Sequence, residues 1–149
     1  MRSVEQLIRR GSEAFLSRPL DEERQRNLVA LADDFRRIAL DDGHGLSARA
    51  DNAYNAVRAV TNVVVGRLGY QIMSAQGHHR DPLEACCAEL GLSQGQHDRL
   101  EALMDLRNNN YKGILGNKDA EAAIAEMELF MEAFSGWLKR KPSARSSPR

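Results

Sequence analysis

Apolar residues recur along most of the chain at the three- and four-residue spacing of an amphipathic helix. No stretch shows the regular alternation of β-branched and polar residues that is typical of a half-buried strand. The spacing predicts helices over residues 4–16, 21–40, 47–70, 81–90, 93–106 and 119–139. We therefore predict an all-α fold, an up-and-down helical bundle of four to five main helices with a short N-terminal helix.

The third predicted helix, 47–70, carries the strongest pattern. Its apolar seam repeats at spacings of four and three through Leu46, Ala50, Ala53, Val57, Val60 and Val64. Further apolar residues widen its second half and leave a narrow polar stripe of Asp51, Asn55, Arg58 and Asn62. A helix that is apolar on most of its circumference is typical of a central or interface position.

Length and charge suggest one domain with two appendages. The 149 residues, 42% of them apolar, suffice for a single core. We divide the chain into an N-terminal helical extension (1–20), the bundle (21–138) and a basic flexible tail (139–149). The tail holds five basic and no acidic side chains in a chain of zero net charge, so the rest is acidic. The tail is either a solvated end or a contact for nucleic-acid phosphates.

Location and cofactors follow from absent patterns. The N-terminus is charged and amphipathic, and no run approaches the roughly 20 apolar residues that span a bilayer, so we expect a cytoplasmic protein without membrane contact. Cys86 and Cys87 are adjacent, which favours reduced thiols. His78 and His79 lack a familiar zinc spacing, which favours loop packing or capping over metal binding. We expect no metal and no cofactor.

Arg107 occupies a position where the pattern expects a core residue. It follows Leu103 and precedes Tyr111, each by four residues, on the apolar stripe of its helix. A buried charge needs an acid, an anion or a subunit boundary. The candidate acids are Asp51 on the central helix and the local Glu101 and Asp105. Arg107 is either a snorkelling arginine in a local salt bridge or a contact for a negatively charged ligand.

Three short motifs resemble the HEPN superfamily of bacterial helical bundles, especially its small free-standing members. They are residues 51–56 (Asp-Asn-Ala-Tyr-Asn-Ala), 77–79 (Gly-His-His) and 106–111 (Leu-Arg-Asn-Asn-Asn-Tyr), in the family's order, and the resemblance covers roughly residues 24–138. It implies a bundle that dimerises with its late arginine helix near the two-fold axis. Members of this kind bind nucleotides or RNA, and many are metal-independent ribonucleases or toxins paired with a nucleotidyltransferase antitoxin.

The sequence departs from the ribonuclease pattern of that family. In active members a histidine follows the arginine by four to six residues, and a histidine can take the 2′-hydroxyl proton while arginine stabilises phosphoryl charge. Here Arg107 and Asn108 match, but the window holds Tyr111, Lys112 and Gly113. Lysine is cationic and tyrosine, with an ordinary pKa near 10, is a poor base. Enzyme activity therefore stays uncertain, and the missing histidine argues against efficient cleavage.

The sequence thus predicts a cytoplasmic HEPN-like homodimer that binds RNA, a nucleotide or another phosphate-bearing ligand. The predicted ligand-binding residues are Arg107, Asn108, Tyr111, Lys112, Asp51 and Asn55. One alternative is a protein–protein interaction module of a toxin–antitoxin or nucleotidyltransferase-associated system. The other is a metal-independent endoribonuclease toxin, in which Arg107 would be catalytic.

Overall fold

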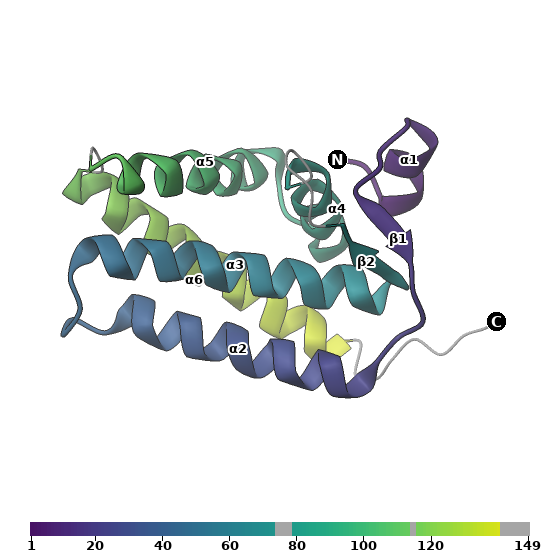
Figure 1. The fold of residues 1–149 in the computed structure, drawn as a ribbon, viewed down its shortest axis with the longest axis horizontal. Helices are drawn as coiled ribbons and strands as arrows, with labels where there is room; N and C mark the ends of the chain where they lie inside the picture. Colours follow the sequence, from purple (N-terminus) through teal and green to yellow (C-terminus); the bar gives the residue numbers. More distant parts are fainter. Residues whose placement is uncertain (74–78, 114–115, 141–149) are drawn as a thin grey trace.

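The computed structural model describes residues 1–73, 79–113 and 116–140, apart from the side chains of 108–111. Within these ranges it contains six helices and one two-stranded sheet (Figure 1). The elements are α1 (Val4–Arg9), β1 (Phe15–Ser17), α2 (Glu22–Leu40), α3 (Leu46–Arg67), β2 (Tyr70–Ile72), α4 (Arg80–Leu90), α5 (Gln94–Tyr111) and α6 (Asn117–Arg140). The predicted all-helical class, with five main helices and a short N-terminal one, is confirmed.

Helix α3 is the centre of the bundle, as its apolar pattern predicts. It lies alongside α2, to which the 41–45 turn joins it, and α6 crosses behind both (Figure 1). Eleven of its 22 residues are buried, including Val60, Val63, Val64 and Val65 at 0% exposure. A helix buried on several sides positions the few polar side chains it carries, because the packing around it leaves its rotation little freedom.

Helix α6 supplies the largest core side chains. Met127, Phe130, Phe134 and Trp137 are each at most 3% exposed and pack in the same cluster as the α3 valines. The indole Nε1 of Trp137 donates a hydrogen bond to the Glu89 carboxylate of α4 at 2.9 Å. This bond satisfies the polar atom of a buried aromatic ring and joins the two helices.

The predicted first helix, 4–16, is wrong in its second half. Helix α1 ends at Arg9, and Gly11 then adopts a left-handed conformation with φ of 96°. The chain continues as β1, which pairs antiparallel with β2, so that Phe15 lies opposite Ile72. The predicted helix 47–70 likewise ends at Arg67 because Gly69, with φ of 95°, turns the chain into β2.

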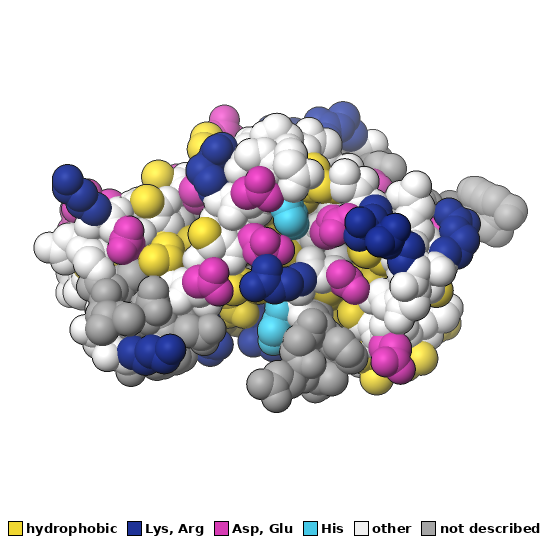
Figure 2. Space-filling view, turned by 90° about the horizontal axis from the view of Figure 1, so that it is seen from above, with side chains coloured by type: hydrophobic (Ala, Val, Ile, Leu, Met, Phe, Trp, Pro, Cys, Tyr) yellow, Lys and Arg dark blue, Asp and Glu magenta, His cyan; other side chains and the backbone are white. Residues whose placement is uncertain are grey.

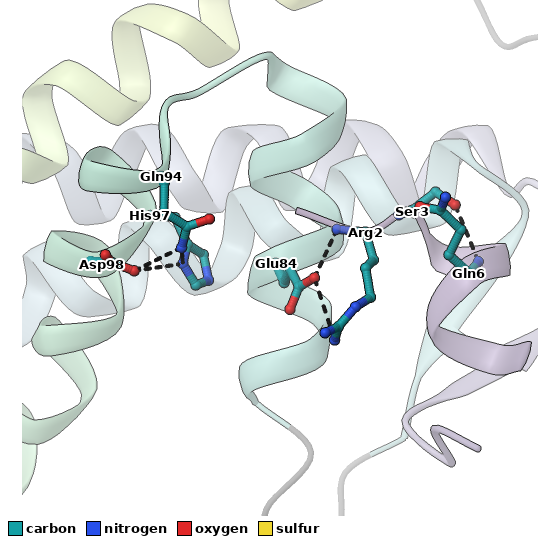
Figure 3. Close-up of polar contacts among 7 residues, drawn as sticks. All are labelled: Arg2, Ser3, Gln6, Glu84, Gln94, His97 and Asp98. Atoms are coloured by element: carbon teal, nitrogen blue, oxygen red, sulfur yellow. Dashed lines mark hydrogen bonds and ion pairs between the residues drawn. The ribbon is translucent and has the colours of Figure 1, made fainter. Parts of the chain in front are cut away.

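The N-terminal extension is held against α4. A reciprocal capping box between Ser3 and Gln6 starts α1, and the Arg2 backbone N–H donates to the Glu84 carboxylate at 2.7 Å (Figure 3). Val4 and Leu7 of α1 pack with Ala85 in a small second apolar cluster. Residues 1–20 are therefore part of the packed structure through both α1 and the sheet.

The remaining boundaries differ little from prediction. The predicted helix 93–106 is longer in the structure, where α5 continues to Tyr111. It runs through the asparagines at 108–110, although the low helix propensity of asparagine weakens this end. Helix α6 extends to Arg140, and the rest of the predicted tail, 141–149, lies outside the described residues. No helix in the described ranges combines the length and apolarity needed to cross a membrane.

Candidate functional site

Arg107 of α5 meets two residues of the central helix. Its Nε lies 3.4 Å from Asp51 Oδ1, and its guanidinium carbon lies 4.9 Å from the centre of the Tyr54 ring. Asp51 and Tyr54 are three residues apart, so α3 presents both on one side, toward α5. The Arg107 and Asp51 side chains are 31% and 26% exposed, but the two atoms in contact, Arg107 Nε and Asp51 Oδ1, are themselves buried. Asp51, the candidate acid on the central helix, thus contacts the arginine.

The structure describes only part of the predicted ligand-binding set. Asn55 is half-buried on α3, and Lys112 is exposed just beyond the end of α5. The side chains of Asn108 and Tyr111 lie outside the described residues. What the structure brings together is therefore Arg107 with Asp51, and with Tyr54, a member of the 51–56 motif that was not predicted as a ligand contact.

A pocket of about 280 Å³ adjoins this group, and Tyr54 belongs to its lining. It opens among α3, β2, the start of α4 and the middle of α5. Its apolar lining is Tyr54, Val57, Ile72, Met73, Pro82, Leu83, Leu100 and Met104. Its polar lining is Arg24, Arg58, Thr61, Asn62, Gln71 and His79. The pocket thus combines an apolar surface with two arginines and a histidine, and no acidic side chain of the described residues lines it.

The outer face that includes α4 and α5 carries both signs of charge, unlike the pocket. Acidic and basic side chains are interspersed on it (Figure 2). Two ion pairs contribute: Arg80 of α4 lies 3.1 Å from Glu101 of α5, and Arg99 of α5 lies 2.7 Å from Glu126 of α6. Opposite charges in contact cancel much of each other's field at a distance. The described part of this face therefore lacks the single-sign basic surface that typically binds extended nucleic acid.

His97 is the described histidine on the same helix as Arg107. It is 6% exposed, and its Nδ1 lies 3.3 Å from Asp98 Oδ1 (Figure 3). Two contacts lower the pKa of the Asp98 carboxyl. The larger effect comes from the hydrogen bond that Gln94 donates at 2.9 Å, and the smaller from the contact with His97. Ten residues of helix place His97 about 15 Å from Arg107 along α5. The two side chains of one chain therefore cannot act on the same phosphate.

His79 lies at the edge of the pocket described above. It precedes α4, lines the pocket and makes no side-chain cap for that helix. His78 lies outside the described residues. Across 1–73, 79–113 and 116–140, no three potential metal-ligating side chains form a cluster.

Sequence reasoning missed most of the pocket. Arg58 and Asn62 belong to the polar stripe of the central helix, and their spacing of four residues was the available signal that they share a face with Tyr54. Arg24 and Gln71 come from α2 and β2, far from that helix in sequence. Only the folded chain places them beside it.

Comparisons of the chain with protein-family models, with curated proteins and with solved structures find no match. The fold class therefore stands on the structure itself, an all-helical bundle with a small two-stranded sheet.

Proposed function

We propose that this protein is a HEPN-like helical domain that acts as a homodimer and binds RNA or a nucleotide through phosphate, with Arg107 as the principal contact. The observation that carries the proposal is the position of Arg107, a partly exposed guanidinium held against Asp51 and the Tyr54 ring. An arginine fixed by an acid and an aromatic face loses less side-chain entropy on binding than a free surface arginine.

Arginine is suited to this role because its planar fork donates to two phosphate oxygens at once. Lys112 lies exposed five residues later, near the end of α5. In the proposed dimer the arginine helices of the two copies meet at the two-fold axis, so each positive side chain is duplicated across one groove. Four cations around one groove would suit a phosphate group or a short single strand.

Two observations bear on the alternatives. The buried position of His97, distant from Arg107 along α5, weighs against a ribonuclease that draws both groups from one chain. The contact between Arg107 and Asp51 within one chain favours a second candidate, an interaction module of a toxin–antitoxin or nucleotidyltransferase-associated system, because the acid already offsets much of the arginine's charge. Binding measurements separate the two candidates.

We expect Arg107→Ala to weaken binding of a fluorescein-labelled single-stranded RNA or of a labelled adenine nucleotide at least tenfold, or about 1.4 kcal/mol. Fluorescence anisotropy gives the dissociation constants. The matched control is Arg99→Ala, which removes an arginine of the same helix that is paired with Glu126. Arg107→Lys should restore only part of the affinity because lysine lacks the bidentate fork.

The result that would refute the proposal is equal affinity of the wild type and Arg107→Ala for both probes. If the wild type binds neither probe, the proposal is also refuted, and the interaction module is favoured. Light scattering on the same samples tests the dimer, since a monomer at every concentration contradicts the shared groove.

A further inference from the structure

We infer that the pocket among α3, β2, α4 and α5 is a binding site for a compact organic anion, with a flat apolar body and one terminal carboxylate or phosphate. This site is distinct from the contact between Arg107 and Asp51, although Tyr54 adjoins both. The inference does not depend on the proposed role of Arg107. It rests on the volume of the pocket, on its combination of apolar and polar lining residues, and on two lining arginines that form no ion pair within the described residues.

The size and the apolar lining define the body of the ligand. A volume of about 280 Å³ lies just below the range of roughly 300–1,000 Å³ that is typical of small-molecule sites. Tyr54, Leu83 and Leu100 are buried side chains of three different helices, so the wall they form belongs to the packed core. A wall held by core packing does not collapse when the pocket is empty. A flat body such as a bicyclic ring is of a size that such a pocket holds.

The arginines of the lining define the charge. In the described part of the chain neither Arg24 nor Arg58 forms an ion pair, whereas Arg36, Arg37, Arg49, Arg80 and Arg99 all do. Arg24 and Arg58 come from different helices, α2 and α3, and reach the same pocket. With no acid among the described lining residues, an anionic group that enters would supply the first negative charge beside them.

The remaining polar groups are oriented by existing hydrogen bonds. Gln71 Oε1 accepts from the Arg18 guanidinium at 3.1 Å, which leaves its amide N–H₂ group as the available donor. Asn62 Nδ2 donates to the Arg58 carbonyl at 3.0 Å, which leaves its Oδ1 as an acceptor. The Thr61 hydroxyl donates to the Val57 carbonyl at 2.8 Å. A few fixed polar groups beside an apolar wall are typical of sites that select a ligand's orientation.

Three matched probes test the inference by isothermal titration calorimetry. They are 2-naphthoate, 2-naphthyl phosphate and the neutral 2-naphthamide, which share one flat body and differ in the terminal group. We expect at least one of the two anions to bind at least tenfold more tightly than the amide. Whether the carboxylate or the phosphate binds better assigns the terminal group. Equal affinity for all three, or no binding of either anion, would overturn the inference.

Two variants place the bound probe. Arg58→Ala should weaken the preferred anion at least tenfold, while Arg26→Ala, an exposed arginine of α2 outside the pocket lining, should not. Met104→Trp should block binding because the larger side chain fills the space between α5 and Tyr54. Circular dichroism checks that this variant folds, and if it does not, Arg58→Ala decides alone. Unchanged affinity in Arg58→Ala contradicts the site.

Discussion

Replacing Trp137 by alanine is expected to lower the free energy of unfolding by about 3–5 kcal/mol. The indole is 1% exposed, and its ring stacks on that of Phe134 with the ring centres 6.1 Å apart. Its removal leaves a cavity in the main apolar core and removes the hydrogen bond that the indole donates to Glu89. The loss is a large part of the roughly 5–15 kcal/mol by which a domain of this size is stable.

Urea denaturation followed by circular dichroism measures this effect without relying on the fluorescence of the removed tryptophan. Trp137→Phe should lower the free energy of unfolding by less than Trp137→Ala, because phenylalanine keeps most of the apolar packing. Its remaining loss reflects the missing hydrogen bond to Glu89. The matched control is Leu129→Ala on the same helix, where the side chain is 48% exposed and the expected loss is below about 1 kcal/mol. A Trp137→Ala variant as stable as Leu129→Ala would contradict the packing of α6.

Periodicity predicted those parts of the fold that local sequence encodes. The seam of the central helix predicted its burial, because side chains three and four residues apart must share a face whatever packs against it. The same rule placed Arg107 on the packed side of α5, and because a buried charge needs a partner, Asp51 followed from the sequence alone as a candidate acid. Each of these two inferences needs only the sequence of a single helix.

The features that were missed depend on segments distant in sequence. Strands β1 and β2 are three residues each, too short to show alternation, and their pairing joins residues more than fifty positions apart. The pocket has the same origin. The helical period places Arg58 on one face of its helix. Tertiary packing alone brings Arg24 of α2 and Gln71 of β2 next to it. Local patterns do not determine such contacts.

Thiol modification is expected to be about a thousandfold slower in the native protein than in the unfolded chain. Burial raises the pKa of Cys87 to about 12 from an ordinary value near 9, and Glu84 contributes further to the increase. Burial, and then the neighbouring Cys87, raises the pKa of Cys86 well above its ordinary value. Only the thiolate reacts, and its fraction at a given pH falls about tenfold each time the thiol pKa rises by one. Reaction with a chromogenic disulfide near pH 8, with and without urea, measures the ratio.

The same raised pKa values make stability depend on pH in one direction. Because the native thiols hold their protons to higher pH than the unfolded ones, the unfolded state loses protons first as pH rises above about 9. The contribution of Cys87 is therefore complete below that pH and is lost progressively toward about pH 12. A variant with both cysteines replaced by alanine should lose less stability over this interval. If the wild type and the variant decline in parallel, or if native thiols react as fast as unfolded ones, then α4 does not bury Cys86 and Cys87 against the bundle.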